Sequence, residues 1–234
     1  MPMTTEPEIL APKLESDLEV QGWHRLPKLL APSDCAGLRA MFDADARFRS
    51  TVTMQRHGFG RGEYRYFAYP LPAAVERLRQ HLYESLAPFA NRWTARLGAS
   101  VTFPADLSDF TRLCHASGQV RPTPLLLRYR AGDYNCLHQD LYGDLHFPFQ
   151  VAILLSEPGE DFEGGEFVLT EQRPRMQSRL HVVPLRMGDA VVFAVNEAPR
   201  TGTRGTYRVK MRHGVSEIRK GERFTLGIIF HDAR

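Results

Sequence analysis

His138 and Asp140 are separated by one residue in the stretch RYRAGDYNCLHQDLYGD, residues 128–144. Residues two apart on a β-strand point to the same face, so this stretch can offer an imidazole and a carboxylate to one metal ion. The pair alone is weak, because nine histidines and 27 acidic residues produce about one such match by chance. The interpretation therefore depends on whether the rest of a site follows in order.

His213, in the stretch VKMRHGVSEI, can supply a third ligand from a different strand. Two histidines and one carboxylate leave three coordination positions open and suit non-haem Fe(II). His146 and His181 are alternative ligands, but neither is followed by a basic residue at a suitable place. Cys136 lies two residues before His138 and is expected to pack in the fold without binding metal.

Arg223 follows His213 by ten residues, and Thr225 lies two residues further on, on the same face of an apolar strand. A basic side chain facing an apolar interior needs a partner, because an unpaired buried charge is costly. The distal carboxylate of 2-oxoglutarate can be that partner through a bidentate contact. Tyr129, on another strand that approaches the metal, can add a hydroxyl contact.

With these parts in order, the chain resembles the Fe(II)/2-oxoglutarate dioxygenases, in particular the prolyl-4-hydroxylase-type catalytic domain. The resemblance runs from about Leu125 to Phe230 and rests on RYRAGDYNCLHQD, DFEGGEFVL, PLRMGDAVVF and HGVSEIRKGERFTLGIIF. Classical prolyl-4-hydroxylases have Lys at the position of Arg223, whereas other branches have Arg. Phe167 stands where the family pattern GGET has Thr, a change for which we expect no consequence.

The resemblance implies a role for each of these side chains. His138, Asp140 and His213 are the expected catalytic metal ligands, and Arg223, Thr225 and Tyr129 the expected cosubstrate-binding residues. The implied cofactors are Fe(II), 2-oxoglutarate and O2, with ascorbate as an optional reductant. The implied reaction hydroxylates a substrate C–H bond and converts 2-oxoglutarate to succinate.

Basic and aromatic side chains alternate with glycines in MQRHGFGRGEYRYFAYPLP, residues 54–72. We expect a mobile substrate lid here, with Arg56, Arg61, Tyr64, Arg65 and Tyr66 as contact residues. Such a composition suits phosphate contacts and stacking on an exposed base. The stretch loosely resembles the lid of AlkB-like demethylases, and bacterial chains of this type are grouped with oxygenases proposed to act on alkylated nucleic acids. The AlkB-like enzymes carry a second Arg shortly after the one that binds 2-oxoglutarate, whereas the corresponding stretch here, LGIIFHD (residues 226–232), has none.

Three functions remain open from these residues. Oxidative demethylation of an alkylated nucleic-acid base is the first, and hydroxylation of a prolyl or other residue in a protein or peptide is the second. The third is a sensor that binds metal and 2-oxoglutarate without turnover. The expected partner is accordingly a nucleic acid or, alternatively, a protein or peptide, and the oligomeric state is not predicted.

The spacing of apolar residues predicts which elements must position these groups. Helices are expected first, in APSDCAGLRAMFDAD with Ser33 as N-cap, in LPAAVERLRQHLYESLAPFANRWTARLG and in PADLSDFTRLCHASG. From residue 123 onward, seven short runs rich in branched and aromatic residues are separated by turn signals, which is typical of a sandwich or barrel. The pattern predicts the fold class α+β, and the resemblance to the Fe(II)/2-oxoglutarate dioxygenases implies a double-stranded β-helix (jelly-roll) in the C-terminal half.

The expected organisation is a loosely ordered segment 1–17 and one domain over 18–234. Within that domain, residues 18–122 are expected to form the supporting helices and the lid, and residues 123–232 the jelly-roll core. The first residues lack the apolar centre of a secretory signal, and no apolar run reaches the length of about 20 residues that a membrane span needs. Three cysteines without paired spacing are typical of a reducing compartment. We therefore expect a cytoplasmic protein with no membrane partner.

Overall fold

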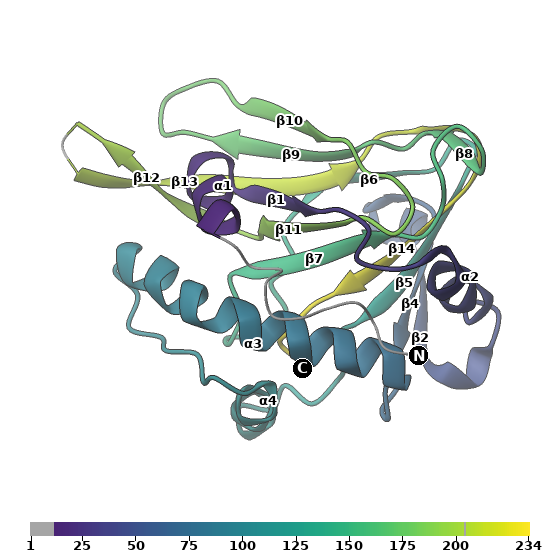
Figure 1. Ribbon diagram of the computed structural model, residues 1–234, viewed down its shortest axis with the longest axis horizontal. Coiled ribbons are helices and arrows are strands. Elements are labelled where there is room, and N and C mark those ends of the chain that lie inside the picture. Colours follow the sequence, from purple (N-terminus) through teal and green to yellow (C-terminus); the bar gives the residue numbers. More distant parts are fainter. Residues whose placement is uncertain (1–11, 204) are drawn as a thin grey trace.

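The computed structural model describes residues 12–203 and 205–234. Two antiparallel sheets form the body of the molecule, and the long helix α3 lies along the outside of the larger sheet (Figure 1). The α-helices in this part of the chain are α1 (Pro12–Gln21), α2 (Pro32–Ala40), α3 (Ala73–Arg96) and α4 (Leu107–Ala116). None of these helices is long and apolar enough to cross a membrane.

The larger sheet has eight strands in the order β1-β11-β7-β14-β5-β4-β2, with β8 paired to β14 outside this path. Their bounds are β1 (Trp23–Leu26), β2 (Phe48–Thr53), β4 (Glu63–Phe67), β5 (Leu125–Arg130), β7 (Phe149–Leu154), β8 (Phe162–Gly164), β11 (Ala190–Ala194) and β14 (Ile218–Ile228).

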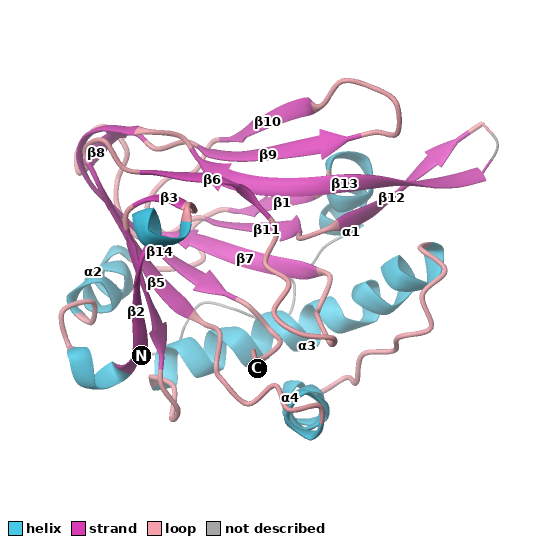
Figure 2. Ribbon diagram, turned by 180° about the vertical axis from the view of Figure 1, so that it is seen from behind, coloured by secondary structure: helices cyan, strands magenta, loops and turns pink. Residues whose placement is uncertain are grey.

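The smaller sheet has six strands in the order β10-β9-β13-β6-β3, with β12 paired to β13. Their bounds are β3 (Gly60–Arg61), β6 (Tyr134–His138), β9 (Phe167–Gln172), β10 (Arg179–Val183), β12 (Glu197–Gly202) and β13 (Gly205–Val215). Figure 2 shows β3 beside β6 at the edge of this sheet. The two sheets together confirm the predicted jelly-roll.

All seven strands expected after residue 123 are present, as β5, β7, β9, β10, β11, β13 and β14. Strands that precede residue 123 also join the sheets, because β1, β2 and β4 belong to the larger sheet and β3 to the smaller one. These strands pair with partners far along the chain, such as Tyr64 with Leu127. Long-range pairing of this kind leaves little trace in local sequence.

Two expectations for the N-terminal part need correction. Residues 12–17 were expected to be loosely ordered, yet they begin α1, in which Leu14 and Leu18 are buried; residues 1–11 lie outside the described residues. Ser33 is not the N-cap of α2, because the helix begins one residue earlier with Pro32 at its first position.

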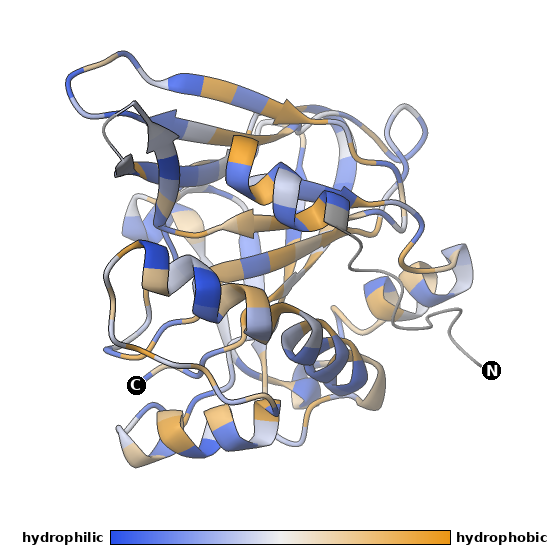
Figure 3. Ribbon diagram, turned by 60° about the vertical axis from the view of Figure 1, so that its left-hand side comes forward, coloured by the Kyte–Doolittle hydropathy of each residue, from blue (hydrophilic) through white to orange (hydrophobic). Residues whose placement is uncertain are grey.

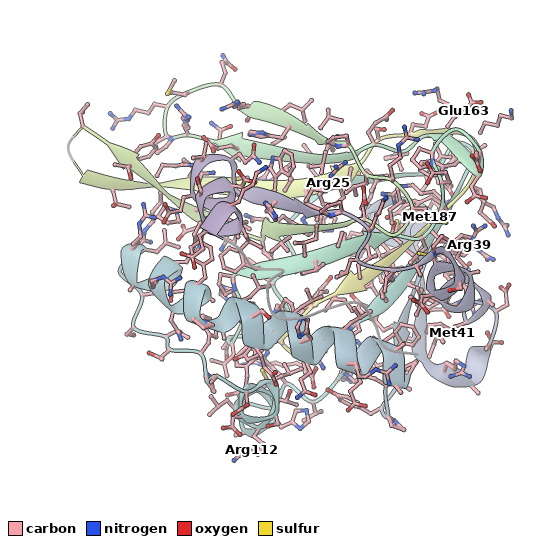
Figure 4. All side chains as sticks on the ribbon, in the orientation of Figure 1. Arg25, Arg39, Met41, Arg112, Glu163 and Met187 are labelled. Carbon is pink, nitrogen blue, oxygen red and sulfur yellow. The ribbon has the colours of Figure 1, made fainter. Side chains whose placement is uncertain are left out.

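The core lies between α3 and the larger sheet, as the apolar faces in Figure 3 illustrate. Tyr83 of α3 packs against Phe147, and Phe89 stacks on Phe149 of β7 with ring centroids 5.4 Å apart. Pro88 lies within α3 without dividing it. The outer side of the helical layer is polar, and Arg112 projects from α4 into solvent (Figure 4).

Candidate metal centre and cosubstrate pocket

The three candidate metal ligands meet between β6 and β13. His213 of β13 is in register with His138, the last residue of β6, and their ring centroids are 4.1 Å apart. Asp140 follows β6 by two residues and is not itself on the strand, so the expected same-strand geometry holds only for His138. The loop brings the Asp140 carboxylate across to both imidazoles.

The distances between the three side chains suit a single small ion. Nε2 of His138 lies 3.5 Å from Oδ1 of Asp140, and Nε2 of His213 lies 3.4 Å from Oδ2. Donor atoms about 2.1 Å from one ion, at roughly right angles, lie about 3 Å apart. All three ligand atoms lie within 4.8 Å of one another. The residues therefore fit a two-histidine, one-carboxylate iron site.

Protonation and orientation also favour metal binding. Burial, helped by the neighbouring His138, lowers the pKa of His213 to about 4, so the imidazole is neutral at neutral pH. Burial alone raises the pKa of Asp140, but its hydrogen bond to His213 and both imidazoles outweigh burial and hold it well below its usual range. Nδ1 of His138 lies 2.8 Å from the Cys136 carbonyl oxygen, which leaves Nε2 free to face the site.

Two tyrosines support the carboxylate from behind. The Tyr142 hydroxyl donates to Oδ1 of Asp140 at 2.6 Å, and the Tyr66 hydroxyl donates to that of Tyr142 at 3.1 Å. Sequence reasoning missed Tyr142, although its position two residues after Asp140 continues the alternation His-x-Asp-x-Tyr. These two hydrogen bonds restrain the carboxylate of Asp140, which is not held on a strand.

Arg223 is a buried cation without an anionic partner. Its side chain is 2% exposed, and no carboxylate lies within 4 Å of it among residues 12–203 and 205–234. Nη1 donates to Oγ1 of Thr225 at 2.6 Å, and Nε has no partner within the same part of the chain. Burial lowers the pKa of Arg223 to about 10, so the guanidinium is still charged at neutral pH. Such a group fits an anionic ligand such as the 5-carboxylate of 2-oxoglutarate.

Tyr129 lies beside this cation. It is in register with Arg223 across β5 and β14, and the guanidinium carbon lies 5.8 Å from its ring centroid. The Tyr129 hydroxyl accepts a hydrogen bond from Nδ2 of Asn135 at 3.2 Å. The structure thus brings together all three residues expected at the cosubstrate end.

One cavity of about 210 Å³ joins the two ends of the site. The metal ligands, Arg223, Thr225 and Tyr129 all line it. Sequence reasoning missed several polar and aromatic residues of its wall, namely Phe59, Asn135, Gln139, Tyr142, Gln150 and Phe193. Phe167 also lines the cavity, with its ring centroid 6.0 Å from that of His213, so the residue that replaces Thr of the family pattern shapes the site.

The residues expected in a mobile lid are divided between two places. Tyr64 and Tyr66 are on β4 within the larger sheet and line the cavity. Arg65 points to the opposite face, where it bonds to Glu63 and Asp45, so it does not line the cavity. The physical reason is the alternation of side chains along a strand, which a lid assignment ignores.

Arg56 and Arg61 do not line the cavity but flank, in sequence, the half-exposed Phe59, which lines it and which we take as its mouth. Arg56 is in the short 3-10 turn η3 (Met54–His57), and Arg61 is on β3, where it pairs with Tyr134 at the start of β6, the strand that ends at His138. Both arginines are exposed. Between them, Phe59 is 47% exposed, stacks on His57 with centroids 5.4 Å apart, and lines the cavity.

Comparison with known proteins gives a family and a fold. The family model Oxygenase-NA, described as an oxygenase catalysing oxidative methylation of damaged DNA, matches residues 62–233. Two proteins of Mycobacterium tuberculosis, the uncharacterized proteins MT2286 and Rv2227, are each 50% identical over 167 residues, which is 71% of this chain and 72% of the relative.

Solved structures share the fold at low sequence identity. A Trichoplax adhaerens prolyl hydroxylase in complex with a hypoxia inducible factor peptide fragment has a TM-score of 0.61 at 13% identity, covering 98% of this chain and 95% of that one. A Burkholderia pseudomallei 2OG-Fe(II) oxygenase has 0.54 at 18%, covering 94% and 91%. A Pseudomonas putida prolyl-4-hydroxylase has 0.54 at 17%, covering 95% and 98%.

These findings confirm the expected enzyme class, because the family is one of oxygenases and the fold is that of the 2-oxoglutarate–Fe(II) oxygenases. The ligand cluster and the unpartnered arginine stand at the two ends of one cavity of that fold. With a family match over most of its length and relatives at 50% identity, the chain belongs to the Oxygenase-NA family of oxygenases.

Proposed function

We propose that this protein is an Fe(II)- and 2-oxoglutarate-dependent dioxygenase that oxidatively demethylates an N-alkylated nucleic-acid base. The observation that carries the proposal is the cavity itself, which has a metal-ligand cluster at one end and an unpaired buried arginine at the other. Hydroxylation of an N-methyl group uses O2 and 2-oxoglutarate and yields succinate, CO2 and an N-hydroxymethyl group. That group then leaves as formaldehyde, which restores the unmodified base.

Each residue of the site has a distinct task. His138, Asp140 and His213 would hold the ferrous ion, which would supply activation of dioxygen. Arg223 and Thr225 bind the 5-carboxylate of 2-oxoglutarate and thereby set the orientation of its keto acid end toward the ligands. The aromatic walls exclude water from the reacting C–H bond.

The surroundings of the cavity mouth favour a nucleic-acid substrate. A base in a duplex must leave the stack to reach a buried metal, and enzymes that do this stack the flipped base on aromatic side chains. Phe59 and His57 offer an exposed aromatic pair at the mouth, and Arg56 and Arg61 flank it with charge available for phosphates. The family description, which names damaged DNA, points the same way.

Hydroxylation of a peptide is the second candidate, and one observation favours it. Tyr134, Leu137 and Leu141 are exposed by 37–45% along β6 and just after it, and the two-residue edge strand β3 pairs with the start of β6. A short edge strand with apolar neighbours can pair with an extended peptide. A sensor without turnover is the third candidate and requires that no substrate class stimulates succinate formation.

A substrate panel separates these functions. Methylated single- and double-stranded oligonucleotides and proline-containing peptides are incubated with Fe(II), 2-oxoglutarate and ascorbate, and succinate, formaldehyde and peptide mass are measured. Formaldehyde in step with succinate supports demethylation, whereas a peptide mass gain of one oxygen supports the second candidate. The absence of succinate with every member of the panel supports the sensor.

Variants at the mouth test nucleic-acid contact directly. Arg56→Ala combined with Arg61→Ala is expected to weaken oligonucleotide binding and to reduce the salt dependence of log Kd by about one unit per lost phosphate contact. Arg65→Ala is the matched control, because Arg65 belongs to the same segment but faces away from the cavity. Equal affinities of the double variant and the control contradict a phosphate-binding mouth.

A further inference from the structure

Gln150 is a buried carboxamide on the cavity wall that lacks a hydrogen-bond partner. It lies on β7, is 3% exposed and lines the cavity. Its Nε2 is buried and has no partner in the described part of the chain. A buried amide donor left unpaired is unfavourable, and native proteins rarely retain one without a ligand, water or functional reason.

Other carboxamides in the interior of this protein are satisfied. Nε2 of Gln139, also on the cavity wall, donates to Oδ1 of Asn196 at 2.9 Å and to the Met211 carbonyl at 2.8 Å. Nε2 of Gln119 donates to the carbonyls of Leu145 and Asp232. Gln150 therefore differs from Gln139 and Gln119 in that its Nε2 has no hydrogen-bond acceptor, and it lines the cavity.

The strand register places Gln150 at the metal end of the cavity. Gln150 is directly opposite Phe193 of β11, and the Phe193 ring centroid lies 4.6 Å from that of His213. The residue of β7 opposite Thr225 is Leu154, four residues away from Gln150. Four residues of strand span about 13 Å, so the carboxamide is remote from the group that anchors the 5-carboxylate.

We infer that Gln150 is a specificity-determining residue, whose Nε2 donates a hydrogen bond to an acceptor on the substrate base next to the metal. This inference rests on the proposed function and deepens it. A carbonyl oxygen on the base pairs with the unpartnered Nε2 as the carboxamide stands, whereas an exocyclic amino group pairs only after the carboxamide turns to present Oε1. The cavity therefore favours an N-methylated base with a carbonyl edge over one with an amino edge.

Two substrates and two variants test the assignment. Oligonucleotides carry a single N-methylthymine, whose exocyclic groups are carbonyls, or a single N-methyladenine, whose exocyclic group is an amine. Gln150→Met removes the donor at similar side-chain length, and Gln150→Glu replaces the donor by an acceptor. Gln80→Met, on the exposed face of α3, is the control for the chemical change.

In the wild-type protein, kcat/KM and oligonucleotide affinity are expected to favour N-methylthymine. Gln150→Met is expected to lower both for N-methylthymine by about ten- to a hundredfold, and Gln150→Glu to reverse the preference. The KM for 2-oxoglutarate stays unchanged in both variants. The melting temperature of Gln150→Met stays equal to that of the wild type or rises, because the substitution removes an unpaired buried donor.

Each other outcome has its own meaning. A wild type that turns over both oligonucleotides, with a preference that Gln150→Met leaves unchanged, overturns the role of Gln150 while the demethylase function stands. A Gln150→Met variant with a raised KM for 2-oxoglutarate places the amide on the cosubstrate, and one with a lowered melting temperature gives it a structural role; both overturn the inference. Turnover of neither oligonucleotide overturns the proposed function and this inference with it.

Discussion

Replacement of Arg223 by Met is expected to stabilise the ligand-free protein while it abolishes tight 2-oxoglutarate binding. Arg223 is fully buried, and its strongest contact is a neutral hydroxyl, Oγ1 of Thr225. Burial lowers its pKa from 12.5 to about 10. A difference of this size corresponds to about 3 kcal/mol of unfavourable free energy for the charged form in the folded state.

The sign follows from comparing the two states. The pKa is lower in the folded chain than in the unfolded one, so the charge opposes folding at every pH below about 10, where both states are protonated. Met removes the charge but also some packing, so we expect Arg223→Met to raise the free energy of unfolding by about 1–3 kcal/mol. The gain is constant between pH 6 and 9.

Ligand binding is expected to change in the opposite direction. Loss of the charge-assisted contact to a carboxylate costs about 2–5 kcal/mol, which is about 30-fold or more in Kd. Urea unfolding without ligand gives the first quantity, and calorimetric titration of 2-oxoglutarate into Mn²⁺-loaded protein gives the second. Arg223→Lys keeps the charge but loses the planar guanidinium, so its Kd for 2-oxoglutarate is expected to lie between those of the wild type and Arg223→Met.

Arg186→Met is the matched control, because Arg186 is exposed and pairs with Glu157 at the surface. It is expected to change neither the free energy of unfolding nor the Kd by more than about 0.5 kcal/mol. A less stable Arg223→Met variant that binds 2-oxoglutarate as tightly as the wild type would refute the reasoning, because Arg223 would then have a structural partner and no ligand.

Three further predictions follow from the same geometry. His231 is buried and accepts a hydrogen bond from the backbone N–H of Phe147, and burial lowers its pKa from 6.5 to about 3. Protonation of His231 therefore favours the unfolded chain. The free energy of unfolding is expected to fall as the pH drops from about 6.5 toward 3, by up to ~1.4 kcal/mol per pH unit. Urea unfolding as a function of pH measures this slope, and His231→Gln should flatten it. Tyr142→Phe removes the hydrogen bond to Asp140 and is expected to weaken Mn²⁺ binding by about 10- to 100-fold in a calorimetric titration, whereas an unchanged affinity shows that the carboxylate is held without it. Treatment with a chelator is expected to abolish succinate formation, which Fe(II) but not Zn²⁺ restores; activity that survives exhaustive chelation contradicts a metal-dependent reaction.

Much of the metal site was predictable from the sequence, because its chemistry is carried by short-range spacing. His-x-Asp spans three residues, and only ten residues separate His213 on β13 from Arg223 on β14, the next strand along the chain. The seven C-terminal strands were also predictable, since branched and aromatic residues between turn signals form strands wherever they pair. The jelly-roll and the enzyme class were expected because the ordered motifs resemble those of the Fe(II)/2-oxoglutarate dioxygenases.

The tertiary structure alone decided which residues surround the metal and which face each strand turns inward. Tyr64 and Tyr66 line the cavity while Arg65 does not, because β4 pairs with β5 in one register. Gln150 is unremarkable in sequence, and only the pairing of β7 with β11 places it beside Phe193 and the metal ligands. Side-chain spacing along a strand is local, whereas the choice and register of the partner strand depend on residues distant in the chain. The metal ligands could therefore be predicted from the sequence, but the residues of the cavity wall could not.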